Sequence, residues 1–117
     1  MTKPFALIIE DDPTLVQVFT ITLETNFDVL AITNGDEALT RLAEMQPDIV
    51  ILDLNLPGAK GSDILKYLRA DLRLAKTRVI LATADALKAD LLRDEADIVL
   101  LKPVSPAQLR ALALRIL

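Results

Sequence analysis

The chain contains neither cysteine nor histidine among its 117 residues. Without cysteine it has no disulfide framework and no thiolate metal site. Without histidine it lacks the commonest general base and metal ligand, which excludes serine–histidine and cysteine–histidine catalysis. Any chemistry must therefore use carboxylates, lysine, serine or threonine, or a bound metal ion.

Aromatic side chains and basic runs are also scarce. Three Phe, one Tyr and no Trp leave no platform on which nucleic-acid bases could stack. Thirteen basic residues against seventeen acidic ones give a formal net charge of −4. A mildly acidic chain without a basic run is a poor binder of nucleic acid, so no direct nucleic-acid partner is expected.

Long apolar runs are missing as well. None approaches the roughly 18 residues that a membrane-spanning helix needs. The run from Phe5 to Ile9 is too short for a signal peptide, and acidic residues follow it at once. We therefore expect a cytoplasmic protein with no membrane partner.

The most informative stretch that is present is the unbroken apolar run from Ile49 to Leu52, which is followed by Asp53. Alternating polarity would indicate one wet face, whereas a short continuous run is typical of a strand buried on both faces of a parallel sheet. Ligands of open α/β sheets bind at the carboxyl ends of the strands. Asp53 therefore lies where such a fold does its chemistry, although by itself it could simply end a strand.

Strand and helix patterns alternate along the whole chain, taken as one domain over 1–117. Apolar runs predict strands over about 5–9, 28–33, 48–53, 78–83 and 98–101. Helical spacing predicts helices over about 13–25, 36–45 and 86–94, one starting near 62 and one from 106 to the end. This order implies an α/β fold of five βα units, a doubly wound parallel sheet with helices on both faces.

Helix starts and buried helix faces can also be predicted. Asp36 and Ser62 are the expected caps of the second and third helices, and Ser105 to Gln108 forms a capping box. The side chains expected to face the core are Leu15, Phe19, Leu23, Ala38, Leu39, Leu42, Ala43, Leu65, Leu68, Leu72, Leu87, Leu91 and Leu92.

Polar residues lie at the ends of four of the five predicted strands. They are Glu10 and Asp11, Asp53 with Asn55, Thr83, and Lys102. Carboxylates brought together at one sheet edge repel one another unless a cation neutralises them, and their oxygens suit Mg²⁺. A lysine adds a positive charge able to hold a phosphate oxygen, and a threonine adds a hydroxyl donor.

Together these groups describe a site for a phosphoryl group on Asp53. An ionised carboxylate can attack phosphorus without a general base, so the lack of histidine is no obstacle. Each residue has an ordinary structural explanation alone: an acidic helix start, a turn residue, a strand threonine or a solvated lysine. Their shared placement at strand ends, with matching polarity, favours the functional interpretation.

The chain resembles the receiver domain of two-component response regulators over essentially its whole length. The segments that carry the resemblance are the acidic pair in Ile8 to Asp12, the phosphoacceptor segment Ile51 to Gly58, the switch-threonine strand Leu81 to Ala84 and the lysine–proline strand end Leu100 to Pro103. The resemblance implies a flavodoxin-like sheet with strand order 2-1-3-4-5.

The resemblance also implies roles for the acidic residues. Asp53 would accept a phosphoryl group from a phosphohistidine of a sensor histidine kinase or phosphotransfer protein. Asp11, Asp53 and the backbone carbonyl of Asn55 would ligate Mg²⁺, with Glu10 acting through water. Asp12 lies just beyond the pair and is not counted as a ligand.

It implies further roles at the other strand ends. Lys102 would bridge to the acyl phosphate, and the peptide bond between Lys102 and Pro103 would be cis. Thr83 would move to bond the phosphoryl group and shift a two-state equilibrium in the last two helices. Asn55 and Asp85 match positions that influence hydrolysis of the phosphoaspartate.

The sequence departs from the receiver pattern in one region. Val99 stands where an aromatic residue is common, and Glu95 where glycine is expected. The segment between Thr83 and Lys102 is about one helical turn short. A truncated or irregular fourth helix is therefore expected.

Three functions are compatible with this pattern. The preferred one is a phosphoacceptor signalling domain that is not an enzyme acting on other substrates. A phosphatase with an aspartyl-phosphate intermediate would favour a second Asp where this chain has Asn55. An unphosphorylated interaction module of the same fold is the remaining alternative.

The last helix is apolar nearly all round. Its apolar residues are Leu109, Leu112, Ala113, Leu114, Ile116 and Leu117. This pattern fits either a well-covered terminal helix or a face that forms a homodimer or binds another partner.

Overall fold

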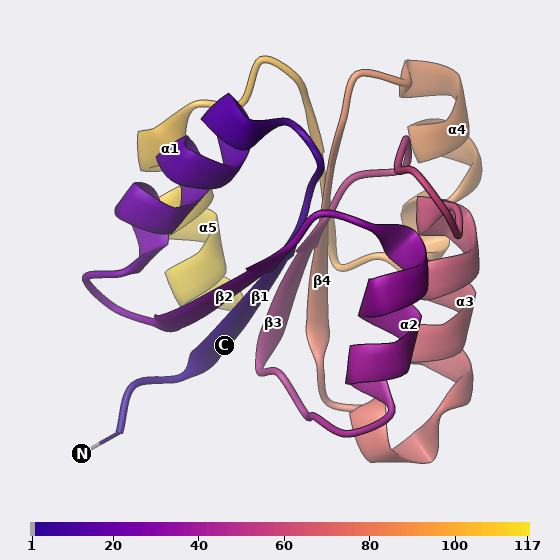
Figure 1. The fold of residues 1–117 in the computed structure, drawn as a ribbon. Coiled ribbons are helices and arrows are strands. Elements are labelled where there is room, and N and C mark those ends of the chain that lie inside the picture. Colours follow the sequence, from indigo (N-terminus) through magenta and orange to yellow (C-terminus); the bar gives the residue numbers. More distant parts are fainter. Residues whose placement is uncertain (1) are drawn as a thin grey trace.

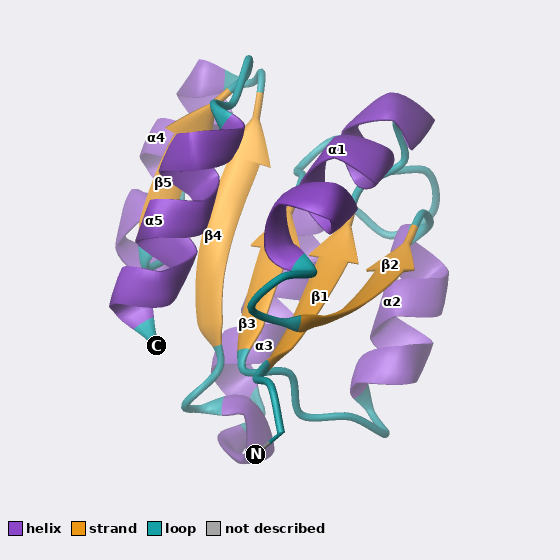
Figure 2. Cartoon of the chain, turned by 90° about the vertical axis from the view of Figure 1, so that its left-hand side faces the viewer, coloured by secondary structure: helices purple, strands orange, loops and turns teal. Residues whose placement is uncertain are grey.

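One parallel sheet runs through the molecule. The computed structural model describes residues 2–117. Its strands are β1 (Phe5–Ile9), β2 (Asp28–Ile32), β3 (Ile49–Leu52), β4 (Arg78–Thr83) and β5 (Ile98–Leu101), in the order β2-β1-β3-β4-β5. All neighbouring strands pair in parallel, as the common direction of the arrows in Figure 2 shows. The predicted α/β fold and its strand order are confirmed.

Helices cover both faces of the sheet. They are α1 (Pro13–Leu23), α2 (Gly35–Leu42), α3 (Gly61–Ala70), α4 (Ala86–Leu91) and α5 (Pro106–Ile116), with short 3₁₀ helices at Leu72–Leu74 and Arg93–Glu95. Figure 1 shows α1 and α5 on one face and α2, α3 and α4 on the other. None of the helices within 2–117 has the length and apolar character required to cross a bilayer.

The continuous apolar runs are explained by burial on both faces. In β1, Leu7 and Ile9 belong to the core that includes residues of α2 and α3, while Ala6 and Ile8 belong to the core that includes residues of α1 and α5. All four are fully buried. Successive side chains of a strand point to opposite faces, so a strand with helices on both faces needs an unbroken apolar run.

The start of α2 differs from the prediction. Asn34 caps the helix, and its side chain accepts hydrogen bonds from the backbone N–H groups of Asp36 and Glu37. The extended backbone of Asn34 (φ −137°, ψ 136°) directs its side chain at these groups. Asp36 therefore lies in the first turn of α2 and is not its cap.

The third helix also begins and ends earlier than predicted. The helix begins at Gly61, so Ser62 lies inside it and is not its cap. Lys60 occupies the cap position, and among residues 2–117 no side-chain hydrogen bond caps the helix there. The backbone is extended at Asp71, which ends α3 and starts a 3₁₀ turn. Leu72 in that turn is 90% exposed, so its predicted place on the buried face is wrong.

The fourth helix is short, as expected, but of the three leucines predicted to be buried only Leu92, just beyond its end, packs against the core. Only six residues are helical, and Ala89 and Leu92 face the sheet. This phase turns Leu87 and Leu91 outward, where they are 74% and 76% exposed. Ala43, just after α2, is likewise exposed.

Candidate functional site

The carboxyl ends of the central strands converge as predicted. Ile9 pairs with Leu52 in the register of β1 and β3, so Glu10 and Asp53 follow the sheet side by side. The backbone N–H of Asp53 donates to the carbonyl of Ile9 at 3.0 Å, and that of Lys102 donates to Thr83 at 2.9 Å. These bonds continue the sheet pattern beyond the strands and fix the backbone from which the polar side chains extend.

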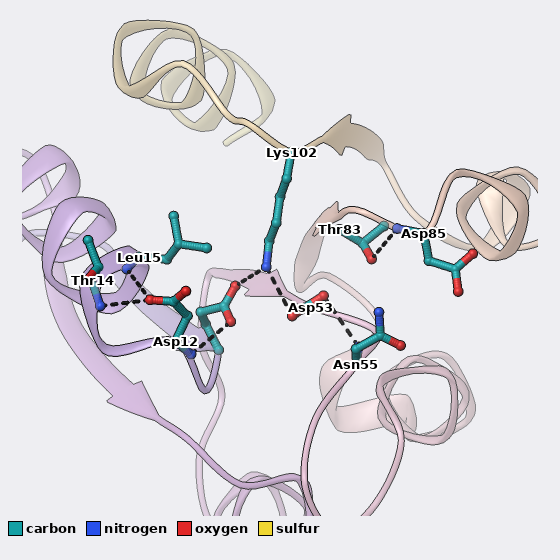
Figure 3. Close-up of polar contacts among 9 residues, drawn as sticks. Asp12, Thr14, Leu15, Asp53, Asn55, Thr83, Asp85 and Lys102 are labelled. Carbon is teal, nitrogen blue, oxygen red and sulfur yellow. Dashed lines mark hydrogen bonds and ion pairs between the residues drawn. The ribbon is translucent and has the colours of Figure 1, made fainter.

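Lys102 joins the two buried carboxylates. Its Nζ lies 2.6 Å from Glu10 Oε1 and 3.1 Å from Asp53 Oδ2. The side chains of Glu10 and Asp53 are only 2% and 6% exposed. Figure 3 shows Lys102 extended from the end of β5 toward Asp53. In such a poorly solvated place, charge-assisted hydrogen bonds hold the groups in fixed positions.

Three carboxylates form a potential cation site beside this lysine. Ligand oxygens of Glu10, Asp11 and Asp53 all lie within 4.8 Å of one another, and Asp11 is exposed. The single ammonium of Lys102 balances only one of the three negative charges. Hard oxygen donors with an uncompensated charge fit a divalent cation such as Mg²⁺, which binds through few carboxylates and keeps several waters.

Burial and pairing shift the pKa values in this cluster. Burial raises the pKa of the Glu10 carboxyl, and the nearby charge of Asp53 adds to this, while hydrogen bonds from Lys102 and Asp12 oppose it. Burial alone would lower the pKa of Lys102, but its hydrogen bonds to Glu10 and Asp53 outweigh burial and raise it. The lysine is thus held in its charged form.

Asp12 is used by the helix that follows it. Its Oδ1 accepts hydrogen bonds from the backbone N–H groups of Thr14 at 2.9 Å and Leu15 at 3.2 Å, as Figure 3 shows. It is the cap of α1, ahead of Pro13. This role agrees with leaving Asp12 out of the predicted ligands.

Thr83 and Asn55 lie beside the cluster, and each makes a different hydrogen bond. The Thr83 hydroxyl oxygen accepts a hydrogen bond from the backbone N–H of Asp85 at 3.1 Å, and the Thr83 residue is fully buried. The backbone N–H of Asn55 lies 3.4 Å from Asp53 Oδ1. Asp85 itself caps α4 by accepting from Lys88 N–H. The structure thus gives Thr83 a contact with the α4 loop in place of one with Asp53.

The remaining features of the strand end agree with expectation. The peptide bond between Lys102 and Pro103 is cis. Val99, at the position where receivers commonly have an aromatic residue, is half-buried and packs against the core that includes Leu81.

A five-stranded parallel sheet of this order, with acidic residues and one lysine at its carboxyl edge, defines a receiver-type α/β protein. The family model described as the response regulator receiver domain matches residues 6–114. The chain therefore belongs to the response regulator receiver family.

Similar proteins agree with this assignment. The DNA-binding response regulator MtrA of Mycolicibacterium smegmatis is 38% identical over 109 residues, which cover 90% of this chain and 46% of MtrA. The chain thus spans about half the length of such curated relatives. The description of MtrA as DNA-binding refers to that whole protein. The expectation that this receiver region makes no direct contact with nucleic acid stays a prediction.

Solved structures share the fold. The chemotaxis response regulator CheY4 of Vibrio cholerae is 25% identical with a TM-score of 0.89, and the match covers 99% of this chain and 100% of CheY4. The BeF₃-activated receiver domain of DrrB, a response regulator of Thermotoga maritima, is 25% identical with a TM-score of 0.86 and coverage of 99% and 97%.

Proposed function

We propose that this chain is a phosphoacceptor signalling domain in which Asp53 receives a phosphoryl group from a phosphohistidine of a sensor kinase or phosphotransfer protein. A carboxylate oxygen of Asp53 forms the new P–O bond as the P–N bond to the donor imidazole breaks. The chain promotes its own phosphorylation and dephosphorylation and acts on no other substrate.

The observation that carries this proposal is the position of Lys102 between two buried carboxylates. Its ammonium lies 3.1 Å from Asp53 Oδ2, so it is placed beside any group attached to that carboxylate. A positive charge there stabilises the negative charge of an acyl phosphate. The raised pKa of Lys102 keeps it protonated for this role.

The acidic cluster fits the metal ion that phosphoryl transfer requires. Asp11, Asp53 and the backbone carbonyl of Asn55 would hold Mg²⁺ directly, and Glu10 would act through water. When bound, Mg²⁺ supplies charge neutralisation for the transferring group. The burial of Glu10 and its bond to Lys102 favour an indirect role for this residue.

Thr83 is suited to report the modification. In its bond with Asp85 the hydroxyl oxygen acts as the acceptor, so its own proton is free to be donated to a phosphoryl oxygen. A shift of Thr83 toward Asp53 would change its contact with the loop before α4. The conformational equilibrium of the α4 and α5 region would then depend on phosphorylation.

Phosphorylation can be tested directly by mass spectrometry. The parent chain, incubated with acetyl phosphate and Mg²⁺, should gain the mass of one phosphoryl group, and Asp53→Asn should gain none. Because the chain has no histidine, a labile phosphohistidine within it cannot mimic the signal. If the parent gains no mass and binds no Mg²⁺, the phosphoacceptor proposal fails and the interaction module becomes the better description.

A further inference from the structure

All three glycines of the chain lie around the loop that joins β3 to α3, residues 53–60. A Cβ at Gly35, the first residue of α2, would lie 1.8 Å from the carbonyl oxygen of Ala59. One at Gly61 would lie 2.2 Å from the carbonyl oxygen of Asp53. These neighbours are backbone atoms, so the start of α2, the loop and the start of α3 touch at positions where only glycine fits.

Hydrogen bonds join the same two segments. The backbone N–H of Gly35 donates to the carbonyl of Pro57 at 2.9 Å. The backbone N–H of Ala59 donates to Asp36 Oδ1 at 3.1 Å. Between them, Gly58 has a φ of +78°, and a Cβ there would lie 2.7 Å from Asp36 Oδ2. The first turn of α2 therefore holds the middle of the loop by its backbone and by one carboxylate.

This loop carries part of the proposed metal site. Asn55, whose carbonyl is the proposed ligand, lies two residues after Asp53 and is exposed. Irregular backbone of this kind depends on contacts from outside the loop for a fixed conformation, and such outer contacts commonly tune metal affinity. The carboxylate of Asp36 is the side chain that supplies one.

We propose that Asp36 is a positioning residue for the metal site: it holds the loop in the conformation that presents the Asn55 carbonyl to a divalent cation. The inference rests on the proposed function, because it concerns the same cation. It assigns to the first turn of α2 a role in site geometry in addition to its role in helix formation.

Matched variants in one turn of α2 test this role. Asp36→Ala removes the acceptor of the Ala59 N–H, whereas Asp36→Asn keeps an oxygen at that place. Glu37→Ala removes the same charge from the same turn, and the Glu37 side chain pairs with Arg41 on the helix itself. Any long-range effect of lost charge on cation binding should therefore appear in Glu37→Ala as well.

Two readouts are needed, both on the unphosphorylated chain. Calorimetric titration with Mg²⁺ should show an affinity about tenfold weaker in Asp36→Ala, with Asp36→Asn and Glu37→Ala close to the parent. Amide hydrogen exchange over residues 54–60 should be faster in Asp36→Ala alone. Parental affinity and parental loop exchange in Asp36→Ala would overturn the inference.

The outcomes distinguish a failure of this inference from a failure of the proposed function. If the parent itself binds no Mg²⁺, the proposed function fails. If Asp36→Ala does not fold, Asp36→Ser tests the same contact, because serine is well tolerated in the first turn of a helix but lacks the carboxylate that accepts from the Ala59 N–H. Weaker Mg²⁺ binding and faster loop exchange in Asp36→Ser support the inference, and parental values of both overturn it.

Discussion

The amino and carboxyl edges of this sheet use charged residues in opposite ways. At the amino edge, Arg69 donates to the carbonyls of Glu95 at 2.6 Å and Thr77 at 3.1 Å, and to the Asp97 carboxylate at 2.9 Å. At the carboxyl edge, one lysine faces three carboxylates whose ligand oxygens lie within 4.8 Å of one another.

The amino edge contains further bonds of the same kind. Arg73 donates to the carbonyls of Met45 and Leu42, and the buried Thr77 hydroxyl donates to Pro47 at 2.7 Å. Each donor satisfies a carbonyl from a segment distant in the sequence. The charged and polar side chains at this edge therefore stabilise the fold, whereas the carboxyl edge keeps unbalanced negative charge available for a ligand.

The largest effect is expected from breaking the carboxyl edge at Lys102. Lys102→Met leaves the buried Glu10 and Asp53 carboxylates without their cation and should lower the free energy of unfolding by about 3 kcal/mol in chelator. Adding Mg²⁺ should recover part of this loss, because a divalent cation neutralises the same carboxylates. Urea unfolding at pH 7, with and without Mg²⁺, measures both effects.

The exposed Lys66 on α3 offers a matched control. Lys66→Met removes the same charge and should leave stability and its response to Mg²⁺ nearly unchanged. Equal stability of Lys102→Met and Lys66→Met would show that Lys102 does not balance the cluster.

A smaller effect is expected at the amino edge, and it should leave the site intact. Arg69→Ala removes the donors to Glu95, Thr77 and Asp97 and should cost about 2 kcal/mol. Arg41→Ala breaks only an exposed pair with Glu37 and should cost about 0.5 kcal/mol or less. Mg²⁺ affinity should stay parental in both, and a weaker affinity in folded Arg69→Ala would contradict the division between the two edges.

The two edges also differ in how far they could be predicted. Convergence of Glu10, Asp53 and Lys102 followed from the sequence, because the carboxyl ends of parallel strands share one edge. The bonds of Arg69 and Arg73 were not predicted, because most of them reach backbone carbonyls between or at the ends of helices and strands, and a backbone carbonyl carries no residue-specific signal. The same reason hid the contact between Asp36 and the backbone of Ala59.

Predictions about helices failed, for example, on which residue caps α2 and on which side of α4 faces the sheet. Asn34 and Asp36 are both good caps, and the extended backbone at Asn34 decides between them. In the six-residue α4, packing of Ala89 and Leu92 sets the rotation of the helix, so Leu87 and Leu91 face outward. Too few turns were present for apolar spacing to define a face.

The smallest effect concerns pH: the contribution of one carboxylate at each edge to the free energy of unfolding should change with pH in opposite directions. Burial raises the pKa of Glu10, so the folded state holds this proton more tightly than the unfolded chain. The contribution of Glu10 to stability should therefore fall as pH rises above about 4.5, its ordinary value. At the amino edge, a hydrogen bond from the backbone N–H of Arg73 lowers the pKa of Asp71. Its contribution should be present above 3.8 and lost as pH falls below that value.

Single substitutions measure these two opposite dependences of the free energy of unfolding on pH. The free energy of unfolding of the parent minus that of Glu10→Gln should decrease from pH 4 toward neutrality in chelator. The difference between the parent and Asp71→Asn should increase as pH rises through the acid range, and it should be small because Asp71 lies at the surface. Any constant cost of losing a hydrogen bond cancels, since only the slope with pH is compared. Slopes of the same sign would mean that burial at the carboxyl edge does not oppose the charge of Glu10, and the contrast between the two edges would then be one of geometry alone.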